Sequence, residues 1–249
     1  MRADAGRLAD RINQGARLVS VACSPGGLRT MATRRPFSLS AFRLVQGLRL
    51  AGLDFATVVD VGANIGQFTA AVQGAWPAAR VLAFEPLADA AGALRRRRGV
   101  EVHQVALGDH DGTTVFYPHA YSLSSSALPV VEGVEDRPWA KENQPIEVPM
   151  RRLDTVLAGE TLAGPVLLKL DVQGLEPAVL GGASATLERV HALLVEVAFE
   201  RAYRDQPLFP EVHRVIEAAG WGHVQPLDWR AEGGRIVEAD LLYRPMQPR

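Results

Sequence analysis

The sequence lacks several features that often identify a function. It has one cysteine, Cys23, which excludes an internal disulfide and a cysteine-rich zinc site. Lysine is scarce as well, because Lys141 and Lys169 are the two lysines among 27 basic residues. Asparagine and isoleucine are also few. Since lysine, asparagine and isoleucine have AT-rich codons, this bias predicts a GC-rich source genome, as in many actinobacteria.

An excess of charge and a long apolar run are also missing. The 27 basic and 28 acidic residues give a net charge of −1, which argues against a nucleic-acid partner. No apolar run approaches the roughly 20 residues that span a bilayer, so no membrane insertion is expected. Arginines and aspartates alternate in the first twenty residues and interrupt any signal-peptide core. We therefore expect a cytoplasmic protein, and its 249 residues fit one domain.

Residues 1–54 form an N-terminal extension with helical patterns. Apolar residues between Leu8 and Val21 are spaced as in a weak amphipathic helix, and a second helix is predicted over 38–53 with Ser40 as its N-cap. We interpret this extension as a helical lid or a dimerisation arm. A homodimer is one expectation that follows from it.

From residue 56 onward, short apolar segments alternate with helical ones. Strands are predicted over 57–61, 80–84, 100–107, 165–170 and 192–197, with two more near Val224 and over 236–242. Helices are predicted over 65–75, 87–98 and 209–219, and from Pro177. This order predicts an α/β fold with a mostly parallel, seven-stranded, Rossmann-like sheet that carries helices on both faces. An insertion near 110–150, with short strands over 112–117 and 146–150, is expected to shape the substrate site.

A glycine loop follows the first strand. Asp60, Gly62, Asn64 and Gly66 form the pattern D-x-G-x-N-x-G, at the place where open α/β sheets bind ligands. The dinucleotide fingerprint G-x-G-x-x-G does not fit, because its second and third glycines would fall on Asn64 and Gln67. The spacing instead resembles the first motif of S-adenosylmethionine-dependent methyltransferases. A nicotinamide-dependent oxidoreductase is therefore the weaker alternative.

Two further positions are candidates for contacts with the adenosine of a cofactor. Glu85 ends the second strand, where an acid can accept hydrogen bonds from both ribose hydroxyls. Ala106 and Asp109 end the third strand and are expected beside the adenine. The alternative for Glu85 is a solvated strand end.

The fourth and fifth strands carry polar residues where apolar ones are expected. Asp171 projects from the carboxyl end of the fourth strand, Lys169 lies deeper in it, and Glu196 interrupts the fifth. Asp171 is also a candidate cofactor contact. Converging carboxylates can orient a hydroxyl, act as a general base or hold Mg²⁺, and Asp171 and Glu196 are candidates for each role. Lys169 is either a substrate contact or part of a structural ion pair.

The insertion holds candidate acceptor contacts. His119, Ser124 and Ser125 lie in its polar loop and can hydrogen-bond a carbohydrate. The alternative is that they are solvated loop residues.

Seven motifs between about residues 56 and 222 carry a family resemblance: Asp60–Gly66, Phe84-Glu85-Pro86, Ala106-Leu107-Gly108-Asp109, Arg152-Leu153-Asp154, Lys169–Glu176, Leu180-Gly181-Gly182-Ala183 and Leu194–Val197. Together they resemble the FkbM family of O-methyltransferases. The segment around Asp171 is the specific part, since most methyltransferases share the glycine loop. Two positions depart from the family pattern: Gln173, where the family usually has Glu, and Ala198, where a His often stands.

The resemblance implies a class I methyltransferase domain over residues 55–249, with S-adenosylmethionine as its cofactor. It also implies methyl transfer to a hydroxyl of a small molecule or glycan. We predict a sugar, oligosaccharide or polysaccharide as acceptor, and a macrolide or other polyketide hydroxyl is the alternative. A third hypothesis is a binding protein that keeps the fold without catalysis. Asp171 is the first candidate for the base and Glu196 the second.

Overall fold

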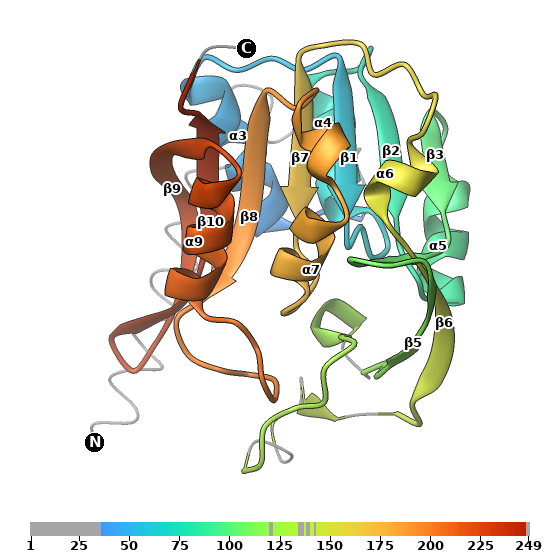
Figure 1. Ribbon diagram of the computed structural model, residues 1–249, viewed down its shortest axis with the longest axis vertical. Coiled ribbons are helices and arrows are strands. Elements are labelled where there is room, and N and C mark those ends of the chain that lie inside the picture. Colours follow the sequence, from blue (N-terminus) through green and yellow to red (C-terminus); the bar gives the residue numbers. More distant parts are fainter. Residues whose placement is uncertain (1–35, 120–121, 134–136, 138–139, 142, 248–249) are drawn as a thin grey trace.

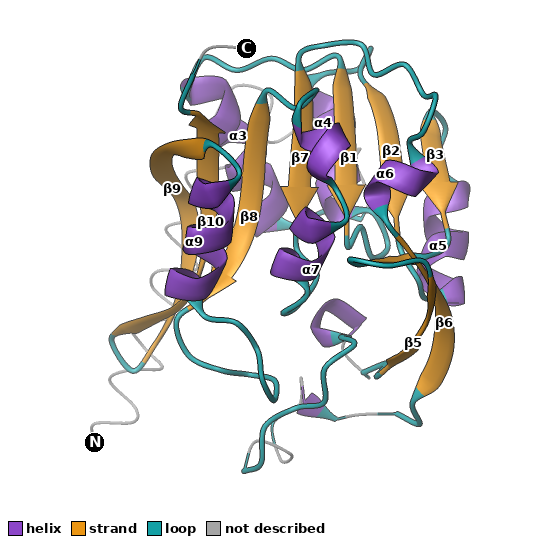
Figure 2. Ribbon diagram, in the orientation of Figure 1, coloured by secondary structure: helices purple, strands orange, loops and turns teal. Residues whose placement is uncertain are grey.

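The computed structural model describes residues 36–119, 122–133, 137, 140–141 and 143–247. Its centre is a seven-stranded sheet with helices on both faces (Figures 1 and 2). In spatial order the strands are β3 (Val100–His103), β2 (Arg80–Phe84), β1 (Thr57–Val61), β7 (Val166–Leu170), β8 (Ala192–Ala198), β10 (Arg235–Pro245) and β9 (Trp221–Glu232). The first five are parallel, and β10 runs antiparallel to both neighbours. The predicted fold class is confirmed.

The strand order places a crevice at the centre of the sheet. The chain runs from β1 outward to β2 and β3 and then returns to β7 on the other side of β1. All residues of β1 and β7 are buried, as their continuous apolar sequences predict. Because helices leave β1 and β7 on opposite sides, the carboxyl ends of these two strands frame an opening in which open α/β sheets bind ligands.

The helices form two layers. On one face, α3 (Leu39–Leu50), α4 (Gln67–Ala75) and α5 (Ala88–Arg95) pack against side chains such as Val58, Leu167 and Ala83. The opposite face carries α7 (Glu176–Gly181), α8 (Ser184–Leu187) and α9 (Phe209–Ala218), together with the short α6 (Leu153–Val156). Within the part of the chain that the structure describes, no helix combines the length and apolarity that crossing a bilayer requires.

One predicted strand is wrong in extent. The apolar pattern over 100–107 predicts a single strand, but β3 ends at His103 and β4 (Ala106–Leu107) belongs to a second sheet. That sheet has the order β4-β6-β5, with β5 (Gly112–Phe116) and β6 (Ile146–Arg151) at the positions predicted from the sequence. The break arises because β4 pairs with β6, which comes some forty residues later in the chain.

The described part of the N-terminal extension packs on the main sheet. Helix α3 begins after Ser38, whose hydroxyl accepts a hydrogen bond from the Ala41 N–H at 3.3 Å, so the predicted N-cap at Ser40 is wrong. Ser40 instead donates to Asp228 of β9 at 3.3 Å. Leu48 of this helix is fully buried. The helix predicted between Leu8 and Val21 lies outside the described residues.

Candidate functional site

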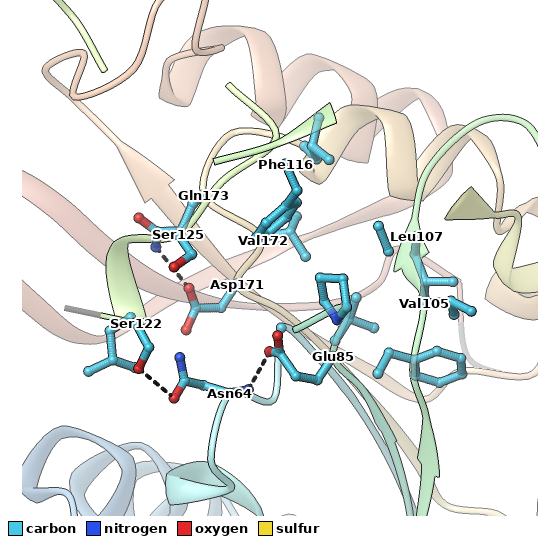
Figure 3. Close-up of a pocket in the computed structure, with 17 residues that line it drawn as sticks. Asn64, Glu85, Val105, Leu107, Phe116, Ser122, Ser125, Asp171, Val172 and Gln173 are labelled. Atoms are coloured by element: carbon cyan, nitrogen blue, oxygen red, sulfur yellow. Dashed lines mark hydrogen bonds between the residues drawn. The ribbon is translucent and has the colours of Figure 1, made fainter. Parts of the chain in front are cut away.

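Two hollows meet at the carboxyl ends of the central strands. The first, which we call the Glu85 cleft, lies between the ends of β1, β2 and β7 and the second sheet (Figure 3). The second, which we call the acidic cavity, measures about 440 Å³ and extends over β7, β8, β10 and β9 toward α3. Five residues line both hollows: Gly62, Asn64, Leu123, Asp171 and Gln173. The two hollows are therefore adjacent, and Asp171 is one of the residues that both share.

The glycine loop after β1 takes a shape that glycine alone permits. Gly62 has a φ of +75°, and a Cβ there would lie 1.8 Å from the carbonyl oxygen of Asp171. Asn64 also has a positive φ, and its side-chain oxygen accepts from the Ile65 N–H and from Ser122 Oγ, at 2.7 and 3.1 Å (Figure 3). Because Gly66 is left-handed too, helix α4 begins at Gln67 rather than at Ile65, where the sequence predicted it.

Glu85 is held at the end of β2 with its carboxylate in the cleft. It accepts hydrogen bonds from the backbone N–H groups of Asn64 and Leu87, both at 2.9 Å, and it is 5% exposed. Burial raises the pKa of Glu85 to about 7, although those two hydrogen bonds and the Lys169 charge oppose the rise. Each oxygen still has a lone pair for a ligand hydroxyl.

The rest of the cleft is a mostly apolar wall. It is formed by Phe84, Val105, Leu107 and Phe116, with Ala106 between them (Figure 3 labels three of these). This wall suits a flat heteroaromatic ring. Asp109 does not line the cleft, because its side chain is 64% exposed and hydrogen-bonds to His110 at 2.7 Å.

Lys169 lies in a buried ion-pair network, which agrees with the second of its two interpretations from the sequence, a structural ion pair. Its Nζ is 3.1 Å from Asp171 Oδ2, 3.4 Å from Asp60 Oδ1 and 3.3 Å from the Gly62 carbonyl oxygen. Asp60 is fully buried and also accepts from Thr69 Oγ1 at 2.7 Å. Burial alone would lower the pKa of Lys169, but the charges of Asp171 and Asp60 outweigh it, so that its pKa is raised and the group stays cationic. Lys169 also lines the acidic cavity.

Acidic side chains form a row across four adjacent strands. Leu170, the last residue of β7, pairs with Val195 of β8, so the next residues along the two strands, Asp171 and Glu196, are neighbours. Asp240 of β10 lies directly opposite Glu196 on one side and Asp228 of β9 on the other. Neighbouring strands are about 4.8 Å apart, so the four carboxylates lie in sequence along the floor of the acidic cavity. Lys169 pairs with one end of the row, and Arg43 pairs with Asp228 at the other, at 3.3 Å.

The sequence reasoning missed Asp228 and Asp240. Both lie in the two C-terminal strands, where alternating polar residues fit a solvent-facing strand equally well. A signal was present in Asp240, because it directly precedes the apolar run Leu241-Leu242-Tyr243. Its pairing with Glu196 depends on the antiparallel insertion of β10, which strand patterns alone do not specify.

The carboxyl groups of the acidic row differ in the direction of their pKa shifts. Burial would raise the pKa of Asp171, but the Lys169 charge and the hydrogen bond from Gln173 outweigh burial and lower it. Burial, and then the charges of Asp171, Glu238 and Asp240, raise the pKa of Glu196 well above its ordinary value. Burial and Asp171 raise the pKa of Asp240 to about 8. The Lys169 charge therefore favours the ionised form of Asp171, whereas burial favours the protonated form of Glu196.

The arrangement gives no support to the expected Mg²⁺ site at Asp171 and Glu196. The Gln173 side-chain N–H group donates to both carboxylates, and the Lys169 ammonium contacts Asp171. A cation between them would compete with these donors for the same oxygen lone pairs. In the described ranges, no group of three or more His, Cys, Asp or Glu side chains is placed to hold a metal.

The three predicted loop residues separate in the structure. Ser124 lines the acidic cavity, and Ser125 lines the Glu85 cleft, where its hydroxyl accepts from the His119 N–H at 3.0 Å. His119 is 4% exposed and lines a different groove, with its ring 6.3 Å from the ring of Tyr203. It lines neither of the two hollows.

Comparison with known proteins identifies the family. The model of the methyltransferase FkbM domain matches residues 60–221. The chain belongs to the FkbM methyltransferase family. Among its relatives, 2-O-methyltransferase NoeI of Sinorhizobium fredii is 28% identical over 198 residues, covering 75% of this chain and 78% of the relative. The 31-O-demethyl-FK506 methyltransferase FkbM of Streptomyces tacrolimicus is 32% identical over 167 residues, covering 56% and 64%.

A comparison of folds gives many similar solved structures. One is the 1,6-didemethyltoxoflavin-N1-methyltransferase of Burkholderia thailandensis, which is 13% identical with a TM-score of 0.46, covering 97% of this chain and 91% of that one. The segment that matches the FkbM family contains Glu85, Asp171 and Glu196 but ends before Asp228 and Asp240. Half of the acidic row therefore comes from the part of the chain that the family model does not match.

Proposed function

We propose that this FkbM-family protein is an S-adenosylmethionine-dependent O-methyltransferase that acts on a hydroxyl of a sugar, oligosaccharide or polysaccharide. One observation carries the proposal: the Glu85 cleft and the acidic cavity lie side by side and share Asp171 in their linings. A methyl donor in the Glu85 cleft and an acceptor in the acidic cavity would then meet beside Asp171, which lies close to Glu196 and Lys169.

The Glu85 cleft fits the proposed cofactor. Its apolar wall suits an adenine, and the fixed carboxylate of Glu85 has free lone pairs for two ribose hydroxyls. Gly62 lets the loop pack closely against the Asp171 backbone, and the amino-acid end of the cofactor would lie beside this loop, which also lines the cleft. When bound, the cofactor supplies an electrophilic methyl group on a sulfonium centre. Among the other predicted contacts, Ala106 fits this assignment by its place in the wall, whereas Asp109 faces away.

The carboxylates prepare the acceptor. An alcohol is a weak nucleophile near neutral pH, so a group that accepts its proton favours methyl transfer. Lys169 lowers the pKa of Asp171, while burial raises the pKa of Glu196, which makes Glu196 the stronger base once it is ionised; we therefore propose Glu196 as the proton acceptor and Asp171 as the anion that orients the hydroxyl. This reverses the order expected from the sequence, because Lys169 stabilises the charged form of Asp171.

The lining of the acidic cavity favours a polyhydroxylated acceptor. Four carboxylates in a row offer hydrogen-bond acceptors to neighbouring hydroxyls, and Trp229 at the cavity is 44% exposed and offers a flat face to a sugar ring. An apolar acceptor would cover these polar oxygens without offering them hydrogen bonds, which is unfavourable. The name of the Streptomyces relative nevertheless keeps a macrolide hydroxyl as the alternative acceptor.

The test is a methyl-transfer screen with isotope-labelled S-adenosylmethionine against bacterial oligosaccharides, glycans and macrolides with free hydroxyls. Mass spectrometry of the products identifies the methylated atom. We expect a labelled O-methyl sugar, with turnover unchanged in EDTA. Products confined to macrolides would support the alternative acceptor. No product with any acceptor, despite binding of S-adenosylhomocysteine in calorimetry, would favour the non-catalytic binding protein.

Asp171→Asn tests the site itself, with Asp109→Asn as the matched control on an exposed side chain. We expect Asp171→Asn to lower kcat by a factor on the order of 10² or more while the affinity for S-adenosylhomocysteine stays within several fold. Asp109→Asn should change neither. Near-normal turnover of Asp171→Asn would remove this residue from the mechanism. The cytoplasmic location and the homodimer stay predictions, the latter to be measured by light scattering.

A further inference from the structure

Gln173 occupies a tightly fixed turn between β7 and α7. It is one of the few non-glycine residues with a positive φ, +54°. Its carbonyl oxygen accepts from Ser126 Oγ at 2.7 Å, and the N–H groups on either side of it, from Val172 and Gly174, donate to the Glu176 carboxylate. An unfavourable backbone conformation that so many contacts maintain is typical of a residue placed for function.

Three hydrogen bonds hold the side-chain amide of Gln173. Its Nε2 has two protons; one is donated to Asp171 Oδ1 at 3.0 Å (Figure 3) and the other to Glu196 Oε2. Its Oε1 accepts from Tyr203 Oη at 2.9 Å. Tyr203 is 1% exposed, and its hydroxyl lies also 2.8 Å from the carbonyl oxygen of Ser124. Because ionised carboxylates can only accept hydrogen bonds, the Nε2 end of the amide faces Asp171 and Glu196, and Oε1 faces Tyr203, whose single hydroxyl proton is shared between Oε1 and the Ser124 carbonyl oxygen.

We propose that Gln173 is a positioning residue that holds the Asp171 and Glu196 carboxylates side by side, and that Tyr203 acts through Gln173 by fixing the orientation of its amide. The inference rests on the proposed function, because these two carboxylates are the groups that would orient and deprotonate the acceptor hydroxyl. Gln173 also lines both hollows, so its amide lies where donor and acceptor would meet.

An amide suits this position better than a carboxylate would. Lys169 faces the Asp171–Glu196 pair from β7, and Glu238 and Asp240 face it from β10. The Glu176 carboxylate lies behind the turn. With so many acids and one lysine, a third charge between Asp171 and Glu196 would repel both. The neutral amide instead supplies an N–H donor to each, which stabilises their ionised forms.

The experiment compares Gln173→Glu, Gln173→Ala and Tyr203→Phe with two matched controls. Gln225→Glu makes the same chemical change on the exposed side of β9, and Tyr243→Phe removes a buried hydroxyl that contacts His213 on the other face of the sheet. The first measurement is a ¹³C NMR titration of labelled Glu side chains in the cofactor-free protein, with Glu196→Gln to assign the signal. The second is kcat and KM as a function of pH.

We expect the Gln173 variants to move the Glu196 titration upward by roughly half a pH unit or more, with Gln173→Glu moving it furthest. The acidic limb of kcat should move in the same direction, since an ionised Glu196 is needed. Tyr203→Phe alone should produce a smaller shift. When Tyr203→Phe is combined with Gln173→Ala, it should add no further shift, because Tyr203 then has no amide to contact. The two controls should leave the titration and the pH profile unchanged.

The outcomes separate this inference from the proposed function. Unchanged titration in the Gln173 and Tyr203 variants, or additive effects of the two, would overturn the positioning role even if sugars are methylated. A shifted, non-additive titration in a protein that methylates no acceptor would support the positioning role and count against the proposed function. If Gln173→Ala fails to fold, Tyr203→Phe and Gln173→Glu still provide the titration.

Discussion

Lys169 shows how much one residue decides in this site. It is one of two lysines in the chain, and it forms ion pairs with both Asp60 and Asp171 beside the two hollows. Sequence reasoning found it because a charge in an apolar strand needs a partner. The same reasoning placed Asp171 and Glu196 near each other, since their strands are neighbours. It did not find Gln173 as a contact between them, because a turn residue's side-chain direction depends on its φ.

Lys169→Met should destabilise the fold by about 3–5 kcal/mol, because it leaves the fully buried Asp60 and the partly buried Asp171 without a counter-charge. Urea denaturation measures the loss. Lys141→Met, at the exposed second lysine, is the control and should change the free energy of unfolding by less than about 0.5 kcal/mol. Adding Asp60→Asn to Lys169→Met should recover part of the stability. Equal stability of the two lysine variants would contradict the ion-pair account.

Glu85 should make cofactor binding depend on pH. Its carboxyl has a pKa of about 7 in the folded protein, raised by burial from 4.5. Because a raised pKa means that the proton leaves only as pH rises through about 7, the better acceptor for ribose hydroxyls forms above that pH. Affinity for S-adenosylhomocysteine should therefore increase between pH 6 and 8, by up to roughly tenfold.

Calorimetry over that pH range checks the Glu85 prediction. Glu85→Gln should bind more weakly and lose most of the pH dependence, since the amide does not titrate. The exposed Asp109→Asn is the control and should keep the wild-type slope. A slope that survives in Glu85→Gln would assign the dependence to another group, such as Glu176, whose pKa burial also raises to about 7.

At the scale of elements, the strands that line the site were the most predictable part of the fold. β1, β7 and β8 are buried on both faces, so continuous apolar runs predict them directly. The error over 100–107 has a different origin. Local alternation continues through Gln104, and the strand divides only because β4 pairs with β6 from a distant segment. Turn geometry and long-range pairing are not encoded in local periodicity.

The close approach of the β1 loop to the end of β7 gives a prediction about glycine. Gly62→Ala should cost roughly 4 kcal/mol or more, because the new Cβ would lie 1.8 Å from the Asp171 carbonyl oxygen. Gly52 has nearly the same φ, +73° against +75°, but no atom within 4 Å of a Cβ, so Gly52→Ala should cost only about 1–2 kcal/mol. Urea denaturation of both variants separates the steric clash from the backbone strain. Equal losses would mean that the loop can move away from Asp171.

At the scale of the molecule, the site is assembled from two parts of the chain. The glycine loop and Glu85 belong to the first half of the sheet, and both follow from short motifs that a sequence reveals. The acidic cavity needs β8, β10 and β9 side by side, and this arrangement exists only in the assembled fold. This is why the sequence points to several residues that line the Glu85 cleft, such as Gly62, Asn64 and Glu85, while Asp228 and Asp240 could not be predicted.

Asp240→Asn tests the acceptor side independently of the cofactor side. If Asp240 binds an acceptor hydroxyl, KM for the acceptor should rise by roughly tenfold, while the affinity for S-adenosylhomocysteine stays unchanged. Asp205→Asn, in an exposed turn, is the matched control and should leave both values unchanged. An equal rise in KM in the control, or a loss of cofactor binding in Asp240→Asn, would show that Asp240 does not act on the acceptor.

The position of β10 also bears on how the protein is made. It comes later in the chain than every other described element, yet it lies inside the sheet, between β8 and β9. During synthesis on a ribosome, β8 therefore remains an open edge and β9 has no strand to join until β10 has emerged. The nascent chain can form the strands around the Glu85 cleft before β10 emerges, but the acidic row closes only once β10 has inserted. A chain stalled before β10 would carry Gly62 and Glu85 without Asp240.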